Sequence, residues 1–291
     1  MADIFDIEDN KPLLVTVFLI IDSLHFVFAR LLLPHIAPAA SVMYILTIAT
    51  IEVGLYGLIR KRLHFEVFIR HRWFFLVIGF LVAASTSINF EAVAFIDVGT
   101  ATILGRATIL FGLGFGLIWL KENLERLQLA GALIAIGGVF TIAFQPVDCL
   151  RFGSLLILCS TFMYALHAAI TKRYGEHIEF LDFFFFRLLC TSGILFIVAL
   201  SRQSLIFPGA RVWLLLILVG TIDVAISRSL YYLALRRLKM SIHAIVLALS
   251  PVAAILWALL LFDTLPNLQQ LIGGFAVISG VLMAVNGVRH A

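Results

Sequence analysis

Charged residues are scarce in this chain of 291 residues. Asp, Glu, Lys and Arg together make up 13% of it, against roughly 25% in a typical soluble domain. Hydrophobic residues make up 62%, and the mean hydropathy is +1.09. A water-soluble fold could not cover its surface with so few polar side chains. The composition therefore excludes an ordinary soluble protein and indicates an integral membrane protein.

Cysteines are also few, and the motifs of several enzyme classes are missing. The three cysteines are odd in number and widely spaced, which favours neither a disulfide framework nor a metal site. The sequence holds no His-Glu-x-x-His zinc motif, no phosphate-binding glycine loop and no nucleophile elbow. We therefore expect no enzyme activity, no catalytic residue, no cofactor and no metal. Any transport would take its energy from a gradient and not from ATP.

Long apolar segments fill most of the chain. A hydrocarbon core about 30 Å thick needs roughly 20 apolar residues for each helical crossing. Ten segments meet this length approximately, and the connections between them are short. The fold class predicted is an all-α integral membrane protein with ten transmembrane helices, at residues 12–33, 41–59, 73–95, 98–120, 127–146, 153–172, 182–200, 211–235, 240–261 and 268–288.

The basic residues are distributed unevenly between the two sides of these helices. With the N-terminus inside, the inner segments hold Lys11, Arg60, Lys61, Arg62, Arg70, Arg72, Lys121, Arg126, Lys172, Arg173, Arg236, Arg237, Lys239 and Arg289. The outer segments and helix ends hold Arg30, Arg151, Arg202 and Arg211. Since Lys and Arg are retained in the cytoplasm, both termini are predicted to be cytoplasmic, in a plasma (bacterial inner) membrane. The net charge of +4 is then a topology signal, and we expect no nucleic-acid partner.

Part of the sequence occurs twice. Residues 100–144 match residues 241–285, and the anchors pair Glu122 with Asp263, Gly131 with Gly273, and Gly138 with Gly280. Two five-helix units follow, over residues 11–146 and 153–288. Because five is odd, the second unit must enter the membrane from the opposite side, which gives an inverted repeat. Such repeats are typical of transporters that work by alternating access.

Several motifs in the repeats point to one family. Tyr232-Leu-Ala-Leu is followed by Ser241, Ala244, Leu249-Ser250-Pro251 and Leu261-Phe262-Asp263, and the first unit carries Leu120-Lys121-Glu122 before Gly131 and Gly138. With these motifs the chain resembles the drug/metabolite transporter superfamily, in its ten-helix EamA-like branch. The resemblance covers nearly the whole chain. It implies a ten-helix transporter fold and leaves the substrate open.

Ionisable residues within the spans are the first candidates for function, because a charge near the bilayer centre costs roughly 2.5–3.5 kcal/mol on insertion scales. Asp22 and His25 lie at i and i+3 on the first helix, and we predict that they couple transport to protons, with Glu91 as a further coupling residue. Arg106 and Asp223 lie near the midplane and are predicted to bind substrate. A structural ion pair between Arg106 and either Asp22 or Asp223 is the alternative.

Polar side chains at helical spacing extend this candidate site. Ser160, Tyr164 and His167 share a face of the sixth helix, and Asp223, Ser227 and Tyr231 share a face of the eighth. Packing is the alternative for His243 on the ninth helix. The predicted substrate-binding set is Arg106, Asp223, Tyr164, Ser227, Tyr231 and His243. Arg187 is predicted to reach the cytoplasmic surface along its alkyl chain.

The function predicted is secondary active transport of a small polar metabolite across the plasma membrane. An amino acid or related carboxylate is the favoured cargo, moved outward by exchange or proton coupling. This hypothesis rests on the family resemblance and on one arginine near the midplane that faces a predicted cavity. Export of cationic drugs or quaternary amines is the alternative, and it would require Asp22, Glu91 and Asp223 to be unpaired. Two further hypotheses are a carrier of lipid-linked headgroups and, as the least favoured, an intramembrane enzyme. The predicted partners are the substrate, the lipid bilayer and protons, and the oligomeric state stays open.

Overall fold

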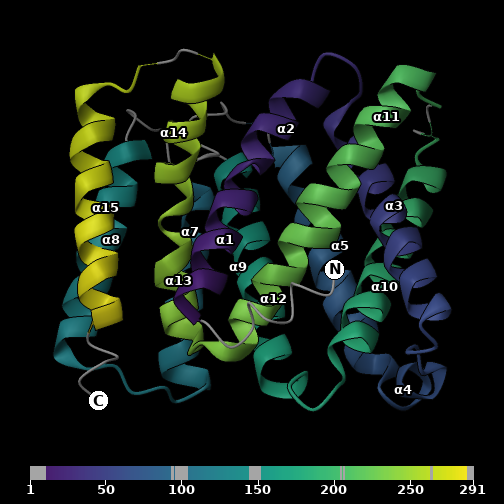
Figure 1. Ribbon diagram of the computed structural model, residues 1–291, viewed down its shortest axis with the longest axis horizontal. Coiled ribbons are helices and arrows are strands. Elements are labelled where there is room, and N and C mark those ends of the chain that lie inside the picture. The colour runs from purple at the N-terminus through teal and green to yellow at the C-terminus, as the bar shows by residue number, and fades with distance from the viewer. Residues whose placement is uncertain are drawn as a thin grey trace.

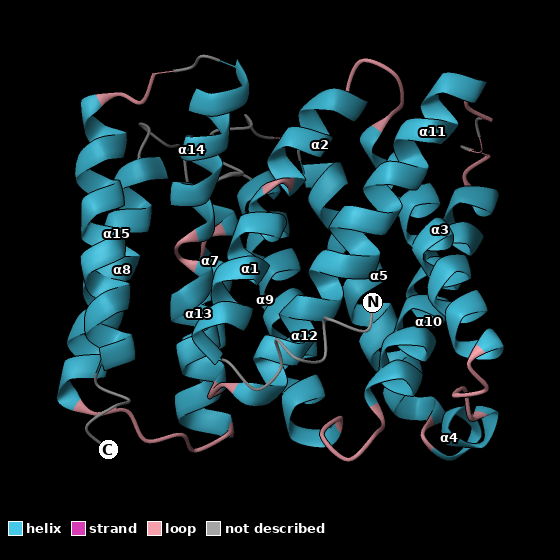
Figure 2. Ribbon diagram, in the orientation of Figure 1, coloured by secondary structure: helices cyan, strands magenta, loops and turns pink. Residues whose placement is uncertain are grey.

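A computed structural model describes residues 11–92, 95, 104–143, 152–203, 205, 207–262 and 265–286, and everything below refers to them. Within these ranges the chain forms helices and no strand. The helices stand roughly side by side in a flat bundle (Figures 1 and 2). The predicted all-α fold class is therefore confirmed for the described part of the chain.

In the first half of the described chain, one helix is interrupted at Leu24 and another continues into a π-helix. The elements of this half are α1 (Lys11–Ser23), α2 (His25–Leu32), α3 (Pro38–Ile59), α4 (Phe65–Arg70), α5 (Arg72–Ala92), α7 (Ala107–Gly114), the π-helix η2 (Phe115–Trp119) and α8 (Arg126–Ala143). The second half comprises α9 (Phe152–Tyr174), α10 (Phe180–Ser201), α11 (Ala210–Val219), the π-helix η3 (Gly220–Ile226), α12 (Ser227–Arg237), α13 (Met240–Leu247), α14 (Ser250–Phe262) and α15 (Leu268–Asn286).

Eight of the described helices are long and apolar enough to cross a membrane, which is fewer than the ten predicted. The two missing crossings are shorter apolar helices, Leu13–Ser23 and Ala107–Trp119, at the positions of the first and fourth predicted spans. The first is short because the helix breaks at Leu24, between α1 and α2. The fourth is short because its predicted beginning, residues 98–103, lies outside the described part. The full count of ten stays a prediction.

Among the described elements, helices α8 and α15 pack against each other most extensively. They stand together at the left of Figure 1. A Cβ atom on Gly138 would lie 2.7 Å from the carbonyl oxygen of Gly273, and one on Gly273 would lie 2.7 Å from the carbonyl oxygen of Gly138. Gly131 and Gly280 oppose each other in the same reciprocal way. The sequence repeat pairs Gly131 with Gly273 and Gly138 with Gly280. If each residue is replaced by its repeat counterpart, the contact between Gly138 and Gly273 becomes the contact between Gly280 and Gly131. That reciprocity is what two units related by a two-fold axis produce.

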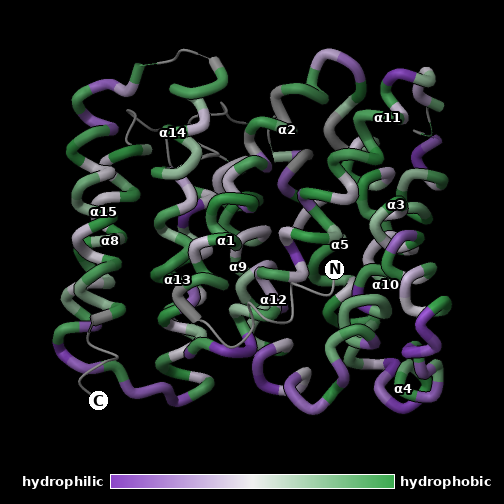
Figure 3. Tube along the Cα trace, viewed as in Figure 1, coloured by the Kyte–Doolittle hydropathy of each residue, from purple (hydrophilic) through white to green (hydrophobic). Residues whose placement is uncertain are grey.

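The basic segments predicted to be cytoplasmic gather at one end of the bundle. The turns that flank α4 and those between η2 and α8, α9 and α10, and α12 and α13 lie along the lower edge of Figure 1. Figure 3 shows hydrophilic residues concentrated along this edge and hydrophobic residues along the helices above it. Here Lys239 donates to the carbonyl oxygen of Asn123 (2.9 Å) and Lys172 to that of Arg236 (2.8 Å).

The orientation of this basic edge remains a prediction that cysteine labelling can test. The background is the chain with Cys149, Cys159 and Cys190 replaced by serine. In sealed cells an impermeant thiol reagent should label Arg202→Cys and leave Arg62→Cys unlabelled until the membrane is permeabilised. The physical reason is the retention of the inner Lys and Arg in the cytoplasm. Equal labelling of both positions in intact cells would contradict this topology.

Candidate functional site

A cavity of about 450 Å³ lies between the two halves of the chain. Its wall combines helices α3 and α5 of the first half with α9, α10, η3 and α12 of the second. The acidic and basic side chains that line it are His25, Arg187, Asp223 and Arg228. Its hydroxyl groups belong to Ser85, Thr86, Thr108, Ser160, Thr161 and Tyr164. The volume falls in the range of small-molecule sites, roughly 300–1,000 Å³.

The cavity lies toward the end of the bundle that is opposite to α4. Its lining residues on α3 are Val42, Ile45 and Leu46, in the first half of that helix, whereas α4 follows the helix's other end. On α5 the lining runs from Val82 to Asn89, which is the half remote from α4. With the predicted topology, this is the outer half of the membrane.

Two local helix irregularities bring the charged side chains to this wall. The first helix is interrupted at Leu24, so Asp22 lies in the last turn of α1 and His25 begins α2. Asp223 belongs to η3, whose wider π-turns change the direction in which its side chains point. Single π-helical turns occur frequently at functional sites, and discontinuous helices form the binding sites of many transporters.

Two ion pairs connect the first helix to the second half of the chain. Nδ1 of His25 lies 2.8 Å from Oδ2 of Asp223, and Nη1 of Arg228 lies 3.2 Å from Oδ1 of Asp22. Asp22 also accepts long hydrogen bonds from Ser227 (3.5 Å) and Ser250 (3.4 Å). Asp22 and His25, which were predicted to act together, thus form ion pairs with different partners in the second half of the chain.

The two pairs differ in their access to the cavity. His25 and Asp223 both line it, and 46% of the His25 side chain is exposed. The Asp22 side chain is only 10% exposed and is not part of the lining. Histidine changes its charge near neutral pH, whereas arginine stays charged. The His25–Asp223 pair therefore presents an imidazole to the cavity, whereas Asp22 is paired with a permanent cation outside the lining.

The other predicted site residues are spread over several environments. Tyr164 lines the cavity, and Ser227 contacts Asp22 beside it. Arg106 directly precedes α7. Gly105 and Thr108, on either side of it in the sequence, line the cavity, but Arg106 does not. Glu91 forms an ion pair with Arg202 and is also absent from the lining.

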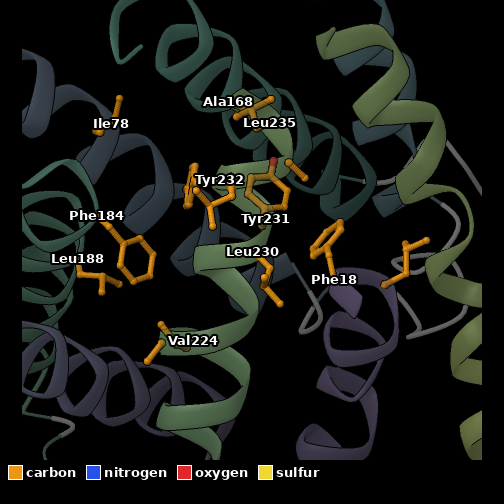
Figure 4. Close-up of a cluster of buried hydrophobic side chains, with 14 of the residues drawn as sticks. Phe18, Ile78, Ala168, Phe184, Leu188, Val224, Leu230, Tyr231, Tyr232 and Leu235 are labelled. Atoms are coloured by element: carbon orange, nitrogen blue, oxygen red, sulfur yellow. The ribbon is translucent and has the colours of Figure 1, made fainter. Parts of the chain in front are cut away.

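Tyr231 and His243 lie in an aromatic cluster rather than in the cavity wall. The His243 ring stacks on Phe18 at 6.0 Å and meets the Tyr231 ring edge-on at 4.7 Å. Figure 4 shows Tyr231 and Tyr232 between Phe18 on one side and Phe184 on the other. Neither Tyr231 nor His243 is a lining residue. Their predicted part in substrate binding would require a rearrangement of this cluster.

Arg187 is placed differently from its prediction. The residue is 2% exposed and lines the cavity, so the expectation that it reaches the cytoplasmic surface is wrong. It lies seven residues after the start of α10, which at 1.5 Å per residue is a depth of about 10 Å. Its guanidinium carbon lies 4.8 Å from the centre of the Tyr232 ring, and that ring's hydroxyl is 2.8 Å from Nε2 of His167.

A contact between the two halves lies at the end of the bundle near α4. The carboxylate of Glu122, after η2, accepts hydrogen bonds from the backbone nitrogens of Met240 (2.6 Å) and Ser241 (2.8 Å) and from the Ser241 hydroxyl (2.6 Å). An anion at a helix N-terminus is favoured by the unpaired N–H groups and the helix dipole. Glu122 therefore fastens the fourth predicted span to the start of α13. Its repeat counterpart, Asp263, lies outside the described residues.

A second polar cluster joins α4 to α10 at the same end. Nδ1 of His64 lies 3.0 Å from Oδ2 of the buried Asp182, whose other oxygen accepts from the His64 backbone nitrogen (2.9 Å). Glu179 lies close enough that the three side chains could present metal-ligating atoms within 4.8 Å of one another. Both Asp182 oxygens already have a partner in His64, so these bonds explain the cluster as a link between the two helices.

Sequence reasoning missed several wall residues. Ser85 and Asn89 stand at i and i+4 on α5, which is the spacing that identified the polar face of the sixth helix, so this signal was present. Arg228 is the second residue of α12, directly after η3, and the π-helical geometry of η3 has no sequence signal. Arg187 follows four consecutive phenylalanines, and that apolar context argues against a solvated side chain.

The comparisons with known proteins agree with this architecture. The model of the EamA-like transporter family matches the chain twice, at residues 12–144 and 151–286. An uncharacterized transporter of Synechocystis sp. (strain ATCC 27184 / PCC 6803 / Kazusa) is 20% identical over 230 residues, which are 74% of this chain and 66% of that protein. The chain thus spans about two thirds of that relative's length. A solved crystal structure superposes with a TM-score of 0.83 at 16% identity, covering 96% of this chain and 99% of the other. That likeness shows the fold.

The two matches to a transporter family and the relative named as a transporter show that this chain is a multi-pass membrane transporter and not an enzyme. The two matches to the family model together cover most of the chain, which is enough to identify the transporter family. The protein belongs to the EamA-like transporter family.

Proposed function

We propose that the protein is a secondary active transporter of the plasma membrane that exports a small amino acid or a related carboxylate by alternating access. The observation that carries the proposal is the cavity wall, which combines basic and acidic side chains from both halves of the chain. A small molecule with both an ammonium and a carboxylate group complements such a wall. Groups of only one charge would favour a purely cationic or purely anionic cargo.

Alternating access is supported by the position of the contact that joins the two halves. Glu122 joins the two halves at the end near α4, and the cavity lies in the other half of the bundle. Breaking this contact while forming an equivalent one at the opposite end would expose the same cavity to the other side. The reciprocal glycine contacts of α8 and α15 provide the symmetry that such an exchange uses.

Export of cationic drugs has less support from the charge arrangement. That function would need unpaired carboxylates, yet all three candidates have a basic partner: Asp22 with Arg228, Asp223 with His25, and Glu91 with Arg202. A permanent cation entering the cavity would have to displace one of these partners. The polar hydroxyls around the cavity fit a small hydrophilic cargo better than a bulky apolar one.

Transport in proteoliposomes tests the proposal. We expect counterflow of at least one of the twenty common amino acids, with accumulation when a proton gradient of the correct sign is imposed. Protein-free liposomes and liposomes without a gradient are the controls. Uptake of tetraphenylphosphonium without uptake of any amino acid would favour the cationic alternative. Movement of a lipid-linked sugar alone would favour the headgroup carrier.

A further inference from the structure

Arg187 presents a buried positive charge to the cavity. Its side chain is 2% exposed and belongs to the lining, and its Nε and Nη1 atoms have no hydrogen-bond partner in the described part of the chain. Leaving N–H groups of a charged side chain without an acceptor inside a protein is costly, so such groups normally find one. An acceptor supplied by a bound molecule would meet this need.

The other charged groups of the wall already have partners. Arg228 is paired with Asp22, and Asp223 with His25. The described residues form no ion pair with Arg187, which therefore contributes one uncompensated positive charge. A singly charged anion balances it, whereas a phosphate dianion would leave one negative charge in excess. The charge of Arg187 therefore favours a singly charged anionic group, such as a carboxylate, over a phosphate dianion.

The contact with Tyr232 does not replace this acceptor. The guanidinium lies 4.8 Å from the ring centre, so the aromatic face attracts the positive charge. The N–H bonds, however, point outward in the plane of the guanidinium, and they need lone pairs in that plane. Packing against Tyr232 fixes where Arg187 lies and leaves two of its nitrogens available.

We propose that Arg187 binds the carboxylate group of the transported molecule. The inference rests on the proposed function, because it takes the cavity as the place where cargo is held. It assigns to Arg187 the part that the sequence suggested for Arg106, which is absent from the lining. Charge-assisted hydrogen bonds of this kind fix the orientation of a cargo as well as its affinity.

The first test changes the ligand and leaves the protein intact. Melting temperatures of the purified transporter are measured with each of the twenty L-amino acids and with the corresponding carboxamides, which keep the shape and lose the negative charge. At least one acid should stabilise the protein, and its amide should bind about 10- to 100-fold more weakly. Equal binding of every acid and its amide would overturn the assignment.

The second test changes the residue. Arg187→Lys should weaken binding of the acid about 10-fold, since an ammonium makes fewer directed hydrogen bonds, and Arg187→Met should remove the preference for the acid over the amide. Arg236→Lys is the matched control: its guanidinium also packs on aromatic rings, of Phe180 and Phe183, but does not line the cavity. An Arg187→Lys variant that binds the acid as wild type does would contradict the inference.

Binding and transport separate the inference from the proposed function. If the acid is transported and Arg187→Met moves it with unchanged KM, the inference fails while the function stands. If no amino acid is transported but an acid binds through Arg187, the function fails and the anion subsite stands. The ligand comparison on the wild-type protein decides the question even when the methionine variant does not fold.

Discussion

Replacing Gly138 with alanine should lower the melting temperature sharply, and replacing it with valine should prevent accumulation of folded protein. A Cβ atom at this position would lie 2.7 Å from both the carbonyl oxygen of Gly273 and the backbone nitrogen of Val277. Backbone atoms cannot rotate away as a side chain does, so α8 and α15 would have to separate. Overpacking of this kind costs about 1–3 kcal/mol and sometimes more. Melting curves and size-exclusion profiles in detergent measure the loss.

The adjacent glycine supplies a matched control. A Cβ atom on Gly137 meets nothing within 4 Å, and the residue is exposed on the lipid-facing side of α8. Gly137→Ala should be neutral or slightly stabilising, because alanine is about 1 kcal/mol more favourable than glycine within a helix. Equal effects of Gly137→Ala and Gly138→Ala would show that helix propensity, and not the close contact, decides the outcome.

The reciprocal position allows a check on the symmetry of the contact. Gly273→Ala should destabilise the protein about as much as Gly138→Ala, because its Cβ would lie 2.7 Å from the Gly138 carbonyl oxygen. The double variant should lose less than the sum of the two losses, since one separation of the helices relieves both clashes. Gly274→Ala, whose Cβ would approach only a side-chain methyl of Val252 at 4.0 Å, should leave the melting temperature nearly unchanged.

The sequence predicted the membrane fold and the repeat because both depend on patterns that burial imposes everywhere along the chain. Apolar length identified the eight long spans, and matched glycines identified the repeat before their contacts were known. The break at Leu24 was not predicted, because no Pro or Gly stands there to indicate it. The ends of helices and the positions of π-helical turns depend on contacts between segments that are distant in the sequence. The spacing of apolar residues along the chain carries no information about these contacts.

The candidate site could be predicted in its residue types but less well in its pairing. Asp223, His25 and Tyr164 line the cavity, as expected for a polar site in a membrane. Helical spacing suggested that Asp22 and His25 act as a pair, yet each bonds across the repeat interface, to Arg228 and Asp223. Spacing along one helix gives the face a residue occupies, and only the packing of two helices decides its partner.

The different pairings predict different results for the two carboxylates. Asp223→Asn should abolish accumulation driven by a proton gradient while leaving equilibrium exchange largely intact. The physical reason is that the His25–Asp223 pair faces the cavity, where an imidazole beside a carboxylate can bind and release a proton. His25→Asn should have the same effect, because either change removes the site that binds and releases the proton. Counterflow and gradient-driven uptake, measured on the same proteoliposomes, separate coupling from binding.

Asp22→Asn should instead destabilise the protein. It leaves the Arg228 side chain, which is 21% exposed, without its carboxylate, and breaking one side of a buried ion pair costs up to about 3–5 kcal/mol. Asp22→Asn combined with Arg228→Gln should recover much of the melting temperature, because no stranded charge remains. The sequence alone suggested Asp22 as the coupling site. That assignment would be correct if the Asp22→Asn variant had normal stability but could not accumulate substrate, while the Asp223→Asn variant could.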